Sequence, residues 1–158
     1  MPNIIEPFRI VLVEPQIPQN TGNIARLCAC TGCELYLVGK LGFVITDKHL
    51  KRAGLDYWND VEIERCGSLQ ELEQKFPHNN FYYISTKAKK LYTDQSFKAG
   101  DFLVFGSETG GLPKELIRNN PDTALRIPMS DGQRSLNLSN SVAIVLYEAI
   151  RQINYLTV

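Results

Sequence analysis

The chain contains a glycine-rich segment, FGSETGGLP at residues 105–113, in which three glycines accompany one carboxylate. Gly106 lets a ligand approach the backbone, and Gly110 and Gly111 permit a sharp bend. The spacing G-x-x-x-G-G differs from the dinucleotide fingerprint G-x-G-x-x-G, and no Gly-Lys-Ser/Thr follows as in a P-loop. Two interpretations stay open: a loop that binds a ligand, and an ordinary strand-to-helix turn with Pro113 at the first helical position.

A second polar segment lies at residues 127–144, which read IPMSDGQRSLNLSNSVAI. Ser135, Asn137, Ser139 and Asn140 supply more hydrogen-bonding side chains than one helix cap requires. One of them is expected to cap the helix that follows. The others either line a pocket or hold the loop in place.

A third segment, PQNTGNIAR at residues 18–26, places Asn20, Asn23 and Arg26 near the start of a predicted helix. Asn23 and Arg26 are three residues apart and therefore share a face, which is not the apolar face of that helix. Arg26 is either a solvated side chain or a cation beside a helix N-terminus, where an anionic ligand would bind.

Two basic clusters are interleaved with aromatic residues, a combination that fits RNA, although most charge runs are solvated faces. One cluster consists of Lys87, Lys89 and Lys90, joined by Lys98, and the other of Lys48, Lys51 and Arg52 near Tyr57 and Trp58.

Four cysteines are present, and three of them form the cluster Cys28-x-Cys30-x-x-Cys33, with Cys66 apart. Zinc sites usually require a second ligand pair at a distance, and only single Cys and His residues remain. We therefore expect small buried helix residues and no metal. The N-terminus does not have the pattern of a signal peptide, so free thiols in a reducing cytoplasm are expected.

Composition is that of an ordinary globular protein, and a single domain over residues 1–158 is expected. Hydrophobic residues make up 44% and charged residues 22% of the chain, which excludes disorder for most of it. No apolar run is long enough to span a membrane. The 17 basic and 17 acidic residues balance, so composition alone does not indicate a strongly basic nucleic-acid binder.

Strand and helix patterns alternate along the chain, which predicts an α/β fold with a mostly parallel sheet flanked by helices. Strands are expected at residues 8–14, 34–39, 61–66, 81–86, 102–108 and 124–129, and helices at 20–31, 47–54, 68–76, 113–119 and 138–154. Asn20 or Thr21 is expected to cap the first helix, and Ser68 with Glu71 forms a capping box. The polar loops that follow the strands lie at their carboxyl ends, where ligands bind in open α/β sheets.

The last predicted helix has two apolar faces. Val142, Val145, Leu146, Ala149 and Ile153 form a core stripe. Ile144 and Tyr147 lie off that stripe, so they contact either another subunit or a larger core.

In combination, the motifs N-x-G-N-x-x-R, FGSE-x-GGLP and IPM…RSLNLSNSVAI resemble the SPOUT superfamily of RNA methyltransferases. Residues 11–32 and the segment RAGLDYW at 52–58 are similar to its short-chain YibK/TrmL subfamily. The resemblance implies transfer of a methyl group from S-adenosyl-L-methionine to the ribose 2′-hydroxyl of C34 or U34 in tRNA, with leucine tRNAs as the expected substrates. It also implies a homodimer that binds the anticodon arm, and a C-terminal deep trefoil knot.

The same resemblance implies a set of cofactor contacts, many of them through the backbone. They are Ile84, Thr86, Gly106, Glu108, Ile127, Ser135 and Leu136. Ser107 and Gly110 stand where relatives carry Pro and Arg, which puts an RNA contact of this loop in doubt.

The resemblance further implies catalytic roles for Arg26, Asn20, Glu108 and Asn137. RNA contacts are expected through Arg26 and, from the basic cluster, through Lys87, Lys89 and Lys90. A charged guanidinium has a pKa above 12 and no lone pair, so it is a poor base. Arg26 either acts as the base or holds a phosphate or the 2′-oxygen. Asn20 and Asn137 orient the ribose or Arg26, and Glu108 orients Arg26 or lies near the sulfonium. Two alternatives are a ribosomal RNA 2′-O-methyltransferase and a non-catalytic knotted RNA-binding protein.

Overall fold

The computed structural model describes residues 5–46 and 59–156. The strands are β1 Arg9–Val13, β2 Glu34–Val38, β3 Ile63–Cys66, β4 Phe81–Ile84, β5 Lys90–Leu91, β6 Phe102–Phe105 and β7 Ala124–Arg126. The helices are α1 Pro18–Thr31, α3 Leu69–Lys75, α4 Lys114–Asn119 and α5 Leu138–Ile153, and η1 Tyr92–Asp94 is a single 3₁₀ turn. Within these ranges the strands form one seven-stranded sheet in the order β3-β2-β1-β6-β4-β7-β5.

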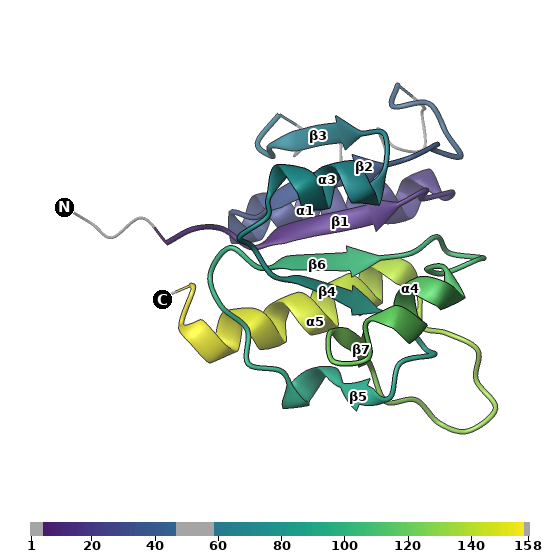
Figure 1. Ribbon diagram of the computed structural model, residues 1–158. Coiled ribbons are helices and arrows are strands. Elements are labelled where there is room, and N and C mark those ends of the chain that lie inside the picture. The colour runs from purple at the N-terminus through teal and green to yellow at the C-terminus, as the bar shows by residue number, and fades with distance from the viewer. Residues whose placement is uncertain (1–4, 47–58, 157–158) are drawn as a thin grey trace.

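Every strand pairing within this sheet is parallel, so the predicted α/β class with a mostly parallel sheet is confirmed. Helices α1 and α5 cover one face of the sheet, and α3 and α4 cover the other (Figure 1). Each face has its own apolar cluster, because strands covered on both sides are hydrophobic throughout. The trefoil knot stays a prediction.

Helix α1 begins earlier than the sequence pattern predicted. Pro18 occupies the first helical position, and Ile17 is the N-cap without a side-chain hydrogen bond. The expectation that Asn20 or Thr21 caps this helix is therefore wrong, because both lie inside it. Thr21 is buried, and its hydroxyl has no hydrogen-bond partner within the described ranges.

Other local predictions agree with the structure. The Ser68 hydroxyl accepts a hydrogen bond from the Glu71 backbone N–H at 3.1 Å, as expected at the start of α3. The Asn137 side chain caps α5 by accepting from the Asn140 N–H at 3.2 Å. The segment 87–100, in which no strand or helix was predicted, differs from expectation because it contains β5 and η1. The predicted helix at 47–54 lies outside the described residues.

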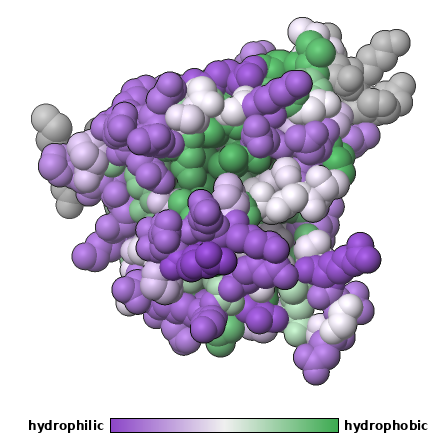
Figure 2. Space-filling model, turned by 45° about the vertical axis from the view of Figure 1, so that its right-hand side comes forward, coloured by the Kyte–Doolittle hydropathy of each residue, from purple (hydrophilic) through white to green (hydrophobic). Residues whose placement is uncertain are grey.

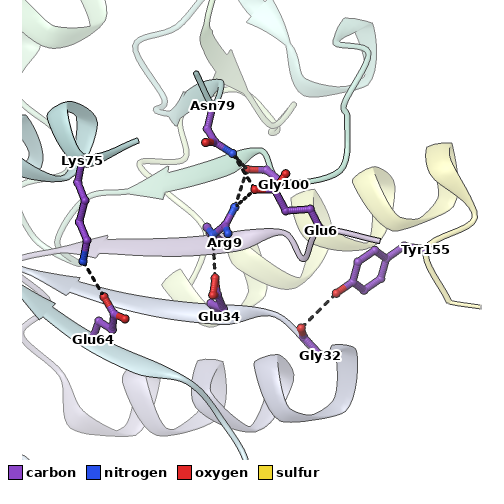
Figure 3. Close-up of polar contacts among 9 residues, drawn as sticks. All are labelled: Glu6, Arg9, Gly32, Glu34, Glu64, Lys75, Asn79, Gly100 and Tyr155. Atoms are coloured by element: carbon purple, nitrogen blue, oxygen red, sulfur yellow. Dashed lines mark hydrogen bonds and ion pairs between the residues drawn. The ribbon is translucent and has the colours of Figure 1, made fainter. Parts of the chain in front are cut away.

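At the amino ends of the strands, the buried Arg9 forms a polar cluster with side chains that are half-buried or exposed (Figure 3). Its guanidinium donates to the carboxylates of Glu6 and Glu34, each at 2.7 Å. Asn79 also donates to Glu6, at 3.1 Å, and hydrogen bonding to Arg9 lowers the pKa of Glu6. These contacts hold the edge of the sheet opposite the polar loops, and they satisfy the Arg9 charge. The cluster is therefore structural.

No helix in the described ranges is long and apolar enough to cross a membrane.

Candidate active site

A cavity of about 700 Å³ lies at the carboxyl edge of the sheet. Loops after β1, β4, β6 and β7 all contribute to its lining. In the sheet, β2 and β3 lie on one side of β1, whereas β6 and β4 lie on its other side. This reversal of strand order creates a crevice, the usual ligand site of open α/β sheets. Figure 2 brings this edge forward and shows hydrophobic surface among hydrophilic side chains.

The cavity gathers the residues that the resemblance named as cofactor contacts. All seven line it: Ile84, Thr86, Gly106, Glu108, Ile127, Ser135 and Leu136. The lining also includes residues that were not predicted as site residues, among them Thr109, Lys114, Met129 and Arg134. Each of them lies within or beside one of the three polar motifs. Their proximity to these motifs in the sequence could therefore have identified them as site residues.

Gly106 directly follows β6, at a point where the chain folds back on itself. A Cβ at this position would clash with the backbone of Gly111 and Leu112. The Ser107 hydroxyl accepts from the Gly110 N–H at 3.0 Å, which closes the turn. The loop 106–112 therefore requires glycine at position 106 for packing against its own backbone.

Three of the four predicted catalytic residues are joined by side-chain hydrogen bonds. The Asn137 amide donates to the Asn20 oxygen at 3.0 Å, and the Asn20 amide donates to Glu108 at 3.2 Å. Asn20 is buried, so both polar ends of its side chain are satisfied within the protein. This chain of contacts ties the starts of α1 and α5 to the loop after β6.

Glu108 also holds the segment that leads into α1. Its carboxylate oxygens accept hydrogen bonds from the backbone N–H groups of Gln16 at 2.9 Å and Ile17 at 2.6 Å. A negative charge at a helix N-terminus is electrostatically favourable. Glu108 therefore fixes the two residues that precede α1, Gln16 and Ile17, rather than capping the N–H groups of its first turn.

Arg26 does not line the cavity of its own chain. It is exposed on α1, on the same face as Asn23. Asn20 and Arg26 are six residues apart, which on an α-helix separates them by about 9 Å along the axis and turns them to different faces. The structure therefore brings Asn20, Glu108 and Asn137 together and places Arg26 elsewhere on the surface.

The first basic cluster is divided by the structure. Lys87 lines the cavity and Lys89 is exposed. The Lys90 ammonium donates to Gln95 at 2.8 Å and to the Asp122 carbonyl at 3.4 Å. Lys98 does not join the cluster, because it precedes β6 at the amino edge of the sheet. The second cluster, Lys48, Lys51 and Arg52 with Tyr57 and Trp58, lies outside the described residues.

The cysteine cluster does not form one buried group. Cys28 and Cys33 are buried, and burial raises the pKa of Cys28 well above its ordinary value and that of Cys33 to about 11. Cys30 is exposed, and Cys33 follows the end of α1. The expectation of small buried helix residues thus holds only for Cys28. Within residues 5–46 and 59–156, no three His, Cys, Asp or Glu side chains are placed to hold a metal ion.

Comparison with known proteins identifies relatives over nearly the full chain. A tRNA (cytidine(34)-2′-O)-methyltransferase from Polaromonas sp. is 49% identical over 148 residues, which cover 92% of this chain and 90% of the relative. A solved structure from work on "the 2-OH methylation of C/U34 on tRNA" is 39% identical with a TM-score of 0.88, covering 94% and 97% of the two chains. An AdoMet-bound rRNA methyltransferase from Sinorhizobium meliloti is 25% identical with a TM-score of 0.83, covering 94% of this chain and 57% of that one.

The SpoU rRNA Methylase family matches residues 7–147, a range that contains β1 to β7 and all three polar motifs. The fold, the cavity and this match agree, and the chain belongs to the SpoU rRNA Methylase family.

Proposed function

We propose that this protein transfers a methyl group from S-adenosyl-L-methionine to the ribose 2′-hydroxyl of C34 or U34 in tRNA. One observation carries the proposal: the cavity at the carboxyl edge is lined by the polar motifs of a chain that is 49% identical to a tRNA (cytidine(34)-2′-O)-methyltransferase over 90% of that relative. A ribosomal RNA substrate is less well supported, since the rRNA methyltransferase is 25% identical and this chain spans 57% of it.

The lining of the cavity fits the cofactor. Its volume of about 700 Å³ lies within the 300–1,000 Å³ of small-molecule sites. Ile84, Ile127 and Leu136 supply apolar surface for a flat ring, and the loop at Gly106 brings backbone polar groups to the same wall. When bound, S-adenosyl-L-methionine supplies an activated methyl group on a sulfonium.

The residues of this chain then position the ribose, which is most of the catalytic task when the methyl group is already activated. Asn137 and Asn20 hold each other in fixed orientations at the cavity wall. Glu108 fixes the position of α1 relative to the loop after β6. We assign Glu108 this positioning role, since its oxygens accept hydrogen bonds from Gln16, Ile17 and Asn20.

Arg26 reaches the reaction, in this proposal, through a homodimer. Ile144 and Tyr147 on α5 are 36% and 49% exposed, and α5 packs beside α1. A second copy that covers this face would lie close to α1. Since Arg26 lies outside its own cavity, we place it at the cavity of the partner copy, where it holds a phosphate or the 2′-oxygen.

Subunit mixing tests this arrangement of Arg26. Arg26→Ala and Gly106→Ala chains are each expected to be inactive as homodimers. Co-expressed with different tags, they form a heterodimer in which one cavity is intact and receives the intact Arg26 from the other chain. Activity of the purified heterodimer at about half the wild-type level is expected. An inactive heterodimer, with both chains folded, would place Arg26 at the cavity of its own chain, and an active Arg26→Ala homodimer would place it outside the mechanism.

The function itself is tested by incubating the protein with isotope-labelled S-adenosyl-L-methionine and either tRNA or ribosomal RNA. With tRNA from the cytoplasm as substrate, label is expected in a 2′-O-methylated C or U at position 34. Leucine tRNAs are expected to be labelled first. Label in ribosomal RNA alone would support the alternative substrate, and label on a base would refute ribose methylation.

A further inference from the structure

Three cations surround the cavity and come from three different segments of the chain. They are Lys87 after β4, Lys114 at the start of α4, and Arg134 between β7 and α5. All three side chains are exposed. None of them has a carboxylate partner within the described ranges. We refer to these three residues as the cationic rim.

The charge of the rim is not compensated by the cavity itself. Glu108 is the only acidic residue in the described lining, and its carboxylate accepts three hydrogen bonds from the start of α1. Glu115 and Asp131 are near in sequence to Lys114 and Arg134, but neither lines the cavity. Clefts lined by charges of one sign attract ligands of the opposite sign.

The cofactor does not account for three cations. S-adenosyl-L-methionine carries a sulfonium, an ammonium and a single carboxylate, so its net charge is positive at neutral pH. Its carboxylate can pair with one cation, and two remain. A nucleotide within an RNA strand carries a phosphate on each side of its ribose, and these two anions match the two remaining cations.

We propose that Lys114 and Arg134 bind the two phosphates that flank the nucleotide to be methylated. The proposal rests on the proposed function, because it takes the RNA strand as the second ligand of the cavity. Arg134 grips a phosphate with the planar, two-point fork of its guanidinium, and Lys114 acts as a point charge. Lys114 begins α4 and Arg134 lies in the loop before α5, so the two residues hold the ribose between them over the cavity.

The test uses the full-length protein and a synthetic RNA hairpin with the sequence of the anticodon arm. Affinity is measured across a salt series for wild type, Lys114→Gln, Arg134→Gln and the double variant. The logarithm of the association constant falls as the logarithm of the salt concentration rises. Each lost phosphate contact should make this slope less steep by about 0.7–0.9. The matched control is Lys98→Gln, which removes an exposed lysine at the opposite edge of the sheet. It should leave the slope unchanged.

Two outcomes would overturn the proposal: slopes equal to that of Lys98→Gln, or a fall in affinity for S-adenosylhomocysteine in the same variants, which would assign these cations to the cofactor. Failure of the proposed function is distinguishable. If the salt slope of hairpin binding depends on Lys114 and Arg134 but wild type never methylates nucleotide 34, the phosphate contacts are supported and the proposed function is refuted. If wild type methylates nucleotide 34 and the variants leave the salt slope unchanged, the proposed function is supported and the phosphate contacts are refuted.

Discussion

Arg26 is the residue on which the proposed chemistry depends most. It is exposed on α1, away from the buried face that includes Ile24 and Cys28, so replacing it should spare the fold. Arg26→Ala should lower the single-turnover rate by about 10²–10³-fold, as expected for loss of a group that stabilises the transition state. Melting temperature and S-adenosylhomocysteine affinity should stay near wild type.

The companion variant Arg26→Lys separates geometry from charge. Lysine keeps the charge and loses the planar fork, so a positioning role predicts a rate nearly as low as that of Ala. If lysine restores most of the rate, charge alone is sufficient. A rate restored with a pH profile shifted to lower pH would instead indicate a base.

The three neighbouring cysteines should differ in reactivity. The thiolate is the reactive form, and a pKa of about 11 leaves about one part in 10³ of Cys33 ionised at pH 8. Burial raises the pKa of Cys28 as well, whereas Cys30 is exposed. Iodoacetamide at pH 8 followed by mass spectrometry should therefore find Cys30 modified and Cys28 and Cys33 spared. Modification of all three at one rate in the native protein would contradict the described packing. All three should react in urea.

The family resemblance named residues that the fold brings together, but it did not predict how they contact one another. Each of the seven expected cofactor contacts lines the cavity, because each lies at the end of a strand or in the loop that follows it, and their contact with the cofactor stays a prediction. The contact between Asn20 and Asn137 spans 117 positions, and no local rule encodes it. Asn20 was expected as a cap because asparagine favours that position, but Pro18 starts the helix two residues earlier.

At the scale of elements, the loop after β6 is the part of the site most sensitive to volume. In Gly106→Ala, the added methyl group would clash with the backbone of Gly111 and Leu112, so the loop must shift. The free energy of unfolding should fall by about 1–3 kcal/mol, and S-adenosylhomocysteine should no longer bind in calorimetry.

Gly110→Ala is the matched control in the same loop. The nearest atom to its added methyl group is the Ser107 hydroxyl at 3.2 Å, on a side chain that can move. Cofactor affinity should be retained. If both variants bind equally well, close packing at Gly106 is not what shapes the cavity.

The elements themselves were largely predictable, and their exact ends were not. Alternating apolar runs and helical periods indicated the parallel sheet, and its pairings confirm it. The short edge strand β5 was missed, because two residues within a basic polar segment are too few to show the alternation of apolar and polar residues that indicates a strand. It forms because Lys90 and Leu91 pair with Leu125 and Arg126 of β7, a contact that depends on the fold.

At the scale of the whole molecule, the dimer is tested through α5. Ile144→Asp combined with Tyr147→Asp places two charges on the exposed apolar face, where burial in an interface would be costly. Sedimentation at micromolar concentration should show a dimer for wild type and a monomer of 17.9 kDa for the double variant. Val44→Asp is the control, since Val44 is 67% exposed and belongs to the segment after β2 rather than to α5. A double variant that remains dimeric would place the interface elsewhere.

The most direct test of the central claim is the methylation state of nucleotide 34 in cells. Transfer RNA from a strain that lacks this gene is compared with RNA from the same strain complemented by wild type or by Gly106→Ala. The account predicts that 2′-O-methylation at C34 or U34 is lost on deletion, is restored by wild type and is not restored by Gly106→Ala. Unchanged methylation at position 34 in the deletion strain, with a methyl group missing from ribosomal RNA instead, would contradict it.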